Sequence, residues 1–128
     1  MPGKKILIVD DDIDLVRLLS RKIAQAGFEA LAAFDASQAF HLAMKESPAL
    51  ILLDIRLPAG GGLGTLQHLK VSSKTSAIPV IIITGQEDPA TKREVEKFGV
   101  DDFLTKPLDM DLLVAKIRAL TGESNAAS

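Results

Sequence analysis

Short continuous runs of apolar residues divide the chain at intervals, and they constrain its fold more than any other feature. Four of them lie at residues 6–9, 50–53, 80–83 and 100–104. A continuous run of this length indicates a strand buried on both faces, as in a parallel sheet covered by helices. An alanine-rich stretch at residues 28–34 is also predicted as a strand, although it has few β-branched residues.

Amphipathic segments with helical periodicity separate these runs, and polar capping residues or glycines mark several of their ends. Helices are predicted over residues 13–26, 36–45, 63–71, 88–98 and 109–120. The strict alternation predicts an α/β fold with right-handed crossovers and an open, doubly wound sheet of five parallel strands, flanked by five helices. A chain of 128 residues is too short for a closed eight-stranded barrel.

Charge and composition exclude several function classes. The 15 basic and 17 acidic residues give a net charge of −2, so neither direct nucleic-acid binding nor membrane binding by a basic surface is expected. The absence of cysteine excludes disulfides, thiolate zinc sites and cysteine nucleophiles. The apolar runs are too short to span a bilayer, and from the residues at the amino terminus we expect no signal peptide. We therefore expect a cytoplasmic protein.

Polar residues that could bind a ligand or take part in a reaction follow the predicted strands directly. Ligands of open α/β sheets bind beyond the carboxyl ends of the strands, where these residues would meet. They are Asp10, Asp11 and Asp12 after the first strand, Asp54 after the third, Thr84 after the fourth and Lys106 after the fifth. Asp10 to Asp12 could instead cap the first helix, and each of the other residues could be an ordinary turn residue. Their joint occurrence at strand ends favours a site.

Carboxylates that converge in this way repel one another unless they hold a proton or bind a cation. With oxygen ligands only, the favoured cation is Mg²⁺ or Mn²⁺. A lysine ammonium and a threonine hydroxyl beside the cation would form a cradle for a phosphoryl group. A carboxylate in such a cradle can act as the nucleophile and form an aspartyl phosphate.

Four separated motifs resemble the receiver domain of two-component response regulators, in the same order and spacing. They are KKILIVDDD at residues 4–12, LLDIRLP at 52–58, ITG at 83–85 and LTKP at 104–107. The resemblance implies a receiver domain over residues 1–121, followed by a polar tail or the start of a linker at 122–128. It also implies a flavodoxin-like sheet in the order 2-1-3-4-5, the order found in the chemotaxis member of this family.

The resemblance implies a role for each matching residue. Asp54 would be the phosphoacceptor, and would take its phosphoryl group from a sensor histidine kinase or a phosphotransfer protein. Asp10, Asp11, Asp54 and the backbone carbonyl of Arg56 would hold Mg²⁺ or Mn²⁺. Thr84 and Lys106 would bind phosphoryl oxygens.

Further positions follow from the same resemblance. Phe103 would be the aromatic switch residue that responds to Thr84, and Pro107 would follow a cis peptide bond. Arg56 and Gln86 occupy positions that tune the lifetime of the phosphoryl group. Phosphorylation would change the face formed by the fourth helix, fifth strand and fifth helix. The domain would be a signalling module rather than an enzyme, although it could catalyse its own phosphorylation and dephosphorylation.

Two other functions stay open at this point. One is an aspartate-nucleophile phosphohydrolase, which Arg56 disfavours because such enzymes usually carry a general acid at that position. The other is an interaction module that works without phosphorylation.

The glycines of the loop at residues 60–62 depart from the family pattern. His41 and His68 are interpreted as surface residues, and the output target and a phosphorylation-linked homodimer are left open.

Overall fold

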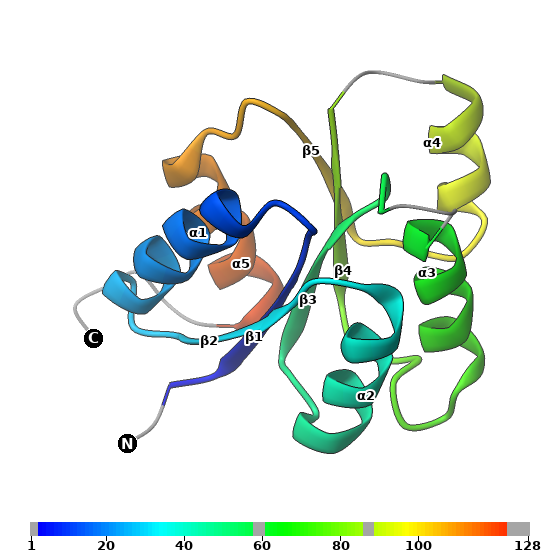
Figure 1. Cartoon of the computed structure of the whole chain (residues 1–128), viewed down its shortest axis with the longest axis horizontal. Helices are drawn as coiled ribbons and strands as arrows, with labels where there is room; N and C mark the ends of the chain where they lie inside the picture. Colours follow the sequence, from blue (N-terminus) through cyan, green and yellow to red (C-terminus); the bar gives the residue numbers. More distant parts are fainter. Residues whose placement is uncertain (1–2, 58–60, 86–88, 123–128) are drawn as a thin grey trace.

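The computed structural model describes residues 3–57, 61–85 and 89–122, and within these ranges strands and helices alternate (Figure 1). The strands are β1 (Lys5–Val9), β2 (Glu29–Ala33), β3 (Leu50–Asp54), β4 (Val80–Thr84) and β5 (Asp102–Thr105). The helices are α1 (Ile13–Gln25), α2 (Ala36–Glu46), α3 (Gly61–Val71), α4 (Pro89–Glu96) and α5 (Met110–Thr121). The alanine-rich stretch is a strand, as predicted.

The five strands form one parallel sheet in the order β2-β1-β3-β4-β5. This confirms the predicted α/β fold and strand order. Strand β1 lies inside the sheet, the chain adds β2 on one side of it, and it then crosses over β1 to continue with β3, β4 and β5 on the other side. The sheet order therefore reverses between β1 and β3, which is the point where ligands of such sheets bind.

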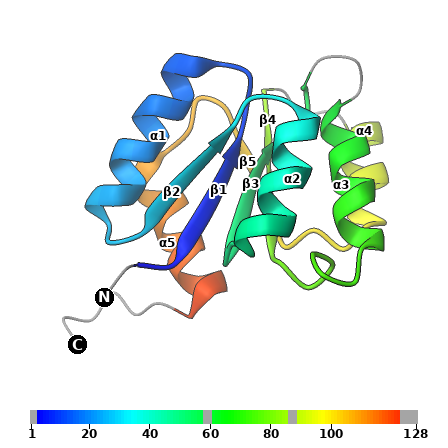
Figure 2. The ribbon, with the colours of Figure 1, turned by 60° about the horizontal axis from the view of Figure 1, so that its bottom comes forward.

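Helices cover both faces of the sheet (Figure 2). Helices α1 and α5 pack on one face, where Leu19, Ile23 and Leu113 belong to one buried cluster. Helices α2, α3 and α4 pack on the other face, where Ala43, Leu66 and Val95 belong to a second cluster. Strand residues alternate between the two clusters, which explains why the strands are apolar throughout.

Aspartates cap three of the helices. The Asp12 carboxylate accepts a hydrogen bond from Leu15 N at 3.1 Å and begins α1. Asp35 and Asp109 begin α2 and α5 in the same way. Because Asp12 caps α1, the carboxylates of Asp10 and Asp11 are not needed for capping this helix. Asp88, the first residue of the predicted helix at 88–98, lies outside the described residues.

Helix α3 begins at Gly61, two residues before the predicted start. The sequence pattern missed this turn because its glycines have no apolar side chain to show periodicity. Gly62 brings the helix very close to the chain after β3, since a Cβ at this position would lie 2.3 Å from the Ile55 carbonyl oxygen. Only a glycine fits such a close backbone approach.

Strand β5 begins at Asp102, two residues after the predicted start. The Asp101 carboxylate accepts a hydrogen bond from Val80 N at 3.0 Å, and Asp101 N donates to Val80 O at 2.9 Å. A side chain thus takes part in the pairing just before the regular ladder starts.

Helix α5 is followed by Gly122 in a left-handed conformation, with a φ of 77°. The predicted tail at 122–128 lies outside the described residues beyond this glycine. No helix in the described part of the chain is both long and apolar enough to cross a membrane.

Candidate functional site

Acidic side chains gather at the carboxyl ends of β1 and β3, the two strands beside the point where the sheet order reverses. Asp54 is the last residue of β3, and Asp10 follows β1 directly. Carboxylate oxygens of Asp10, Asp11 and Asp54 all lie within 4.8 Å of one another. We call these three residues the acidic cluster. The structure therefore brings together side chains that are more than forty positions apart, as the strand-end argument predicted.

Lys106 approaches the acidic cluster from the loop after β5. Its Nζ lies 3.1 Å from Asp10 Oδ2 and 3.4 Å from Asp54 Oδ2. The side chains of Asp10 and Asp54 are only 1% and 6% exposed, whereas that of Lys106 is 30% exposed. The lysine therefore bridges two buried carboxylates and keeps contact with solvent.

Backbone N–H groups hold the other oxygen of each buried carboxylate. Asp10 Oδ1 accepts a hydrogen bond from Asp12 N at 3.0 Å. Asp54 Oδ1 accepts one from Arg56 N at 2.8 Å. These bonds orient both carboxylates with Oδ2 toward Lys106. Sequence reasoning missed this role of residues 12 and 56, because a backbone donor has no side-chain signature.

The acidic cluster contains more negative charge than Lys106 can balance. Burial raises the pKa of Asp10 above its usual value, and the charge of Asp54 raises it further, against hydrogen bonds from Asp12 and Lys106 that lower it. Partial burial lowers the pKa of Lys106, but the hydrogen bond to Asp10 and the charges of Asp54 and Asp10 raise it more, so that the net shift is upward. The folded chain therefore holds a proton at Asp10 more tightly than a solvated aspartate would.

The donor set of the acidic cluster fits a hard divalent cation. It consists of carboxylate oxygens alone, which suits Mg²⁺ and excludes the soft sites that thiolates form. A divalent cation would also offset the charge of Asp54, which adds to the effect of burial on the pKa of Asp10. Asp11, which is exposed, places its carboxylate on the solvent side of the cluster, where a hydrated ion can enter.

Thr84 lies at the carboxyl end of β4, next to β3, the strand that carries Asp54. Asp54 pairs with Ile83 across the β3–β4 ladder, so Thr84 is one residue farther along the neighbouring strand. Its carbonyl oxygen accepts a hydrogen bond from Lys106 N at 2.8 Å. The backbones that carry the predicted hydroxyl and the predicted lysine are thus joined directly.

The remaining predicted positions have varied surroundings. Phe103 is half-buried on β5, and Arg56 is exposed just after β3. The peptide bond between Lys106 and Pro107 is cis, as the resemblance implied.

Gln86 and Gly60 lie outside the described residues. His41 and His68 are exposed, as predicted, and the His68 ring packs edge-on against Phe40.

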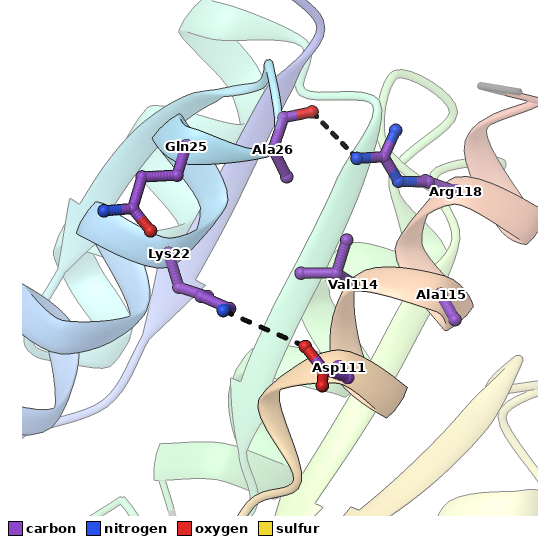
Figure 3. A pocket seen from close by; sticks show the side chains of 7 residues that line it. All are labelled: Lys22, Gln25, Ala26, Asp111, Val114, Ala115 and Arg118. Atoms are coloured by element: carbon purple, nitrogen blue, oxygen red, sulfur yellow. Dashed lines mark hydrogen bonds and ion pairs between the residues drawn. The ribbon is translucent and has the colours of Figure 1, made fainter. Parts of the chain in front are cut away.

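A groove of about 500 Å³ lies elsewhere, between α1 and α5 (Figure 3). Arg118 donates to the Ala26 carbonyl at 3.2 Å and lies over the Phe28 ring, and Lys22 Nζ is 3.8 Å from Asp111 Oδ1. Its charged side chains thus contact groups of the protein itself. The acidic cluster is the better candidate for chemistry.

Known proteins share both the fold and the sequence pattern. The family model described as "Response regulator receiver domain" matches residues 6–118. The chain is 37% identical over 117 residues to the "Probable transcriptional regulator ycf27" of Cyanophora paradoxa, which covers 91% of this chain and 48% of that protein. It is 36% identical over 120 residues to the "Phosphate regulon transcriptional regulatory protein PhoB" of Pseudomonas aeruginosa, covering 94% of this chain and 52% of that protein.

A solved structure of a receiver domain has the same fold as this chain. The receiver domain of the Francisella response regulator 1452 superposes with a TM-score of 0.84 at 29% identity, covering 94% of this chain and 98% of that chain. The present chain spans about half the length of the two curated relatives just described.

Proposed function

Because the chain belongs to the family of response regulator receiver domains, we propose that it is a phosphorylation switch whose phosphoacceptor is Asp54. One observation supports this choice of residue above all. Asp54 is a buried carboxylate with one oxygen held by Arg56 N, and its other oxygen faces Lys106 beside the two further carboxylates of the acidic cluster. A carboxylate oriented in this way can act as a nucleophile.

The proposed reaction is transfer of a phosphoryl group from a phosphohistidine of a sensor kinase or phosphotransfer protein. A bond forms between phosphorus and a carboxylate oxygen of Asp54, and the bond between phosphorus and the histidine nitrogen breaks. Lys106, whose Nζ is 3.4 Å from Asp54 Oδ2, would stabilise negative charge on the phosphoryl oxygens. The Thr84 hydroxyl would bind another of these oxygens from β4.

Receiver domains bind Mg²⁺ at an acidic pocket, and the acidic cluster is the proposed site here. Asp10, Asp11, Asp54 and the Arg56 carbonyl would hold Mg²⁺ or Mn²⁺. The cation would supply charge neutralisation that lets an anionic phosphoryl donor approach three carboxylates. The residues of the chain itself orient the nucleophile and bind the transferred group.

Receiver domains are signalling modules rather than classical enzymes. We propose that this domain can nevertheless promote its own phosphorylation by small phosphoryl donors and its own dephosphorylation, with Arg56 and Gln86 tuning the lifetime. Its partners would be a histidine kinase and an output that reads the face of α4, β5 and α5. Two of its relatives are named transcriptional regulators, so control of transcription through an output domain is a natural role.

The test is to incubate the protein with Mg²⁺ and acetyl phosphate and to record its intact mass. We expect one added phosphoryl group in the wild-type protein and none in Asp54→Asn. Asp102→Asn is the matched control, because Asp102 is a carboxylate paired with Lys116 outside the acidic cluster, and it should still accept the group. An adduct that persists in Asp54→Asn would exclude Asp54 as the acceptor. Rapid turnover of many phosphate esters would instead indicate a phosphohydrolase.

A further inference from the structure

Phe103 and Thr84 lie on the same face of the sheet, on neighbouring strands. Thr84 pairs with Thr105, and Ile82 pairs with Phe103, across the β4–β5 ladder. Because side chains alternate along a strand, residues 82, 84, 103 and 105 share one face, and Thr84 is a diagonal neighbour of Phe103. An aromatic ring at a diagonal position of the ladder can respond to a displacement of the Thr84 side chain.

The Phe103 ring also contacts helix α4. The Lys92 Nζ lies 5.2 Å from the centroid of the ring, within the range of a cation–π interaction. The ring is half-buried against the cluster that α2, α3 and α4 cover, and Lys92 is exposed. The ammonium therefore covers the outer side of a ring whose inner side packs on the core.

The backbone of Phe103 is tied in the opposite direction, to helix α5. Phe103 N donates a hydrogen bond to Asp102 Oδ1 at 2.8 Å. Asp102 Oδ2 pairs with Lys116 of α5 at 2.5 Å. The backbone position of Phe103 is thus held independently of Lys92, so that a change at Lys92 acts on the ring rather than on the strand.

We propose that Lys92 is a latch that holds the Phe103 ring under α4 and opposes its turn toward Thr84. This inference rests on the proposed function, since the turn is driven by a phosphoryl group that draws Thr84 toward Asp54. A ring that turns inward leaves the exposed ammonium and loses the cation–π contact. The latch therefore raises the degree of phosphorylation that is needed for switching. It does so through a residue that touches neither the cation nor the phosphoryl group.

The expected size follows from the strength of such contacts. A cation–π interaction at an exposed site corresponds to a factor of about two to five in a two-state equilibrium. Lys92→Gln removes the charge and should strengthen apparent binding of beryllofluoride, a phosphoryl mimic, by about two- to fivefold in the presence of Mg²⁺. Lys92→Arg keeps a cation over the ring and should bind like the wild-type protein. Lys97→Gln is the matched control, because Lys97 is exposed just after α4.

Fluorine NMR of protein labelled with 4-fluorophenylalanine reads the ring directly. The chain has five phenylalanines, and Phe103→Leu identifies the signal of residue 103. Titration with beryllofluoride should move this signal at lower concentration in Lys92→Gln than in the wild-type protein. Equal titration curves would overturn the latch and leave the switch intact, and so would an identical effect of Lys97→Gln. A wild-type protein that does not bind beryllofluoride at all would overturn the proposed function and the latch with it.

Discussion

The two ends of the parallel sheet carry ion pairs of opposite character. At the amino end, Lys5 Nζ of β1 lies 2.9 Å from Glu46 Oε1 of α2, one base against one acid. At the carboxyl end, Lys106 faces two buried carboxylates, with the Asp11 carboxylate close by. The pKa of Glu46 is lowered by the hydrogen bond and the charge of Lys5, whereas the pKa of Asp10 is raised by burial and by the charge of Asp54. The pair at the amino end therefore stabilises the fold. The group at the carboxyl end has excess negative charge that a bound cation would neutralise.

The largest expected effect comes from removing Lys106, and removal of Lys5 at the other end is its comparison. Lys106→Gln leaves buried Asp10 and Asp54 without their cation and should lower the free energy of unfolding by about 3 kcal/mol near neutral pH without Mg²⁺. Lys5→Gln breaks a pair whose carboxylate is 25% exposed, against 1% and 6% for Asp10 and Asp54, and it should have a much smaller effect because water can solvate Glu46. Urea denaturation of the two variants measures the difference, and equal losses would remove the distinction between the ends.

Mg²⁺ should act at the carboxyl end only. At a free concentration one hundred times its dissociation constant, a cation that binds the folded chain alone adds about 2.7 kcal/mol to the free energy of unfolding. Asp10→Asn should lose this gain, and Glu46→Gln should keep it. Thermal denaturation with and without Mg²⁺ tests both variants, and an unchanged response in Asp10→Asn would place the cation elsewhere.

A pair of glycines separates backbone geometry from charge at the carboxyl end. Gly62→Ala places a Cβ 2.3 Å from the Ile55 carbonyl oxygen and should cost about 2 kcal/mol of stability. It should also weaken Mg²⁺ binding, because the chain just after Asp54 must shift. Gly64→Ala in the same helix meets no atom within 4 Å and should stabilise the protein by about 0.5 to 1 kcal/mol. Denaturation curves that rank these variants in the reverse order would contradict the close approach at Gly62.

The smallest effects are two pH dependences of opposite sign, measured without Mg²⁺. The folded-state pKa of Asp10 is raised above 3.8, so its contribution to stability increases as the pH falls through the range between that raised value and 3.8. The pKa of Glu46 is lowered from 4.5, so its contribution is lost as the pH falls below 4.5. Difference curves of Asp10→Asn and Glu46→Gln against the wild-type protein isolate each contribution, and slopes of the same sign would contradict this comparison.

Much of the site could be predicted, because parallel strands deliver their next residues to a common edge. Asp10, Asp11, Asp54, Thr84 and Lys106 were all expected there from their places after the apolar runs. The start of α3 was not, because the periodicity of apolar side chains cannot detect a turn made of glycines. The contact between Lys92 and Phe103 could not be predicted either, since nothing in the local sequence of Lys92 indicates a ring on another element.

The sequence by itself determined the alternation of strands and helices, the sheet order that the family motifs implied, and the candidates for the acidic cluster. Only the tertiary structure decided how similar aspartates differ. Asp10 is buried and its pKa is raised, Asp11 is exposed, and Asp12 caps α1. The physical reason is that burial, hydrogen bonding and neighbouring charge depend on residues far away in the chain, whereas apolar periodicity is a local property of each segment.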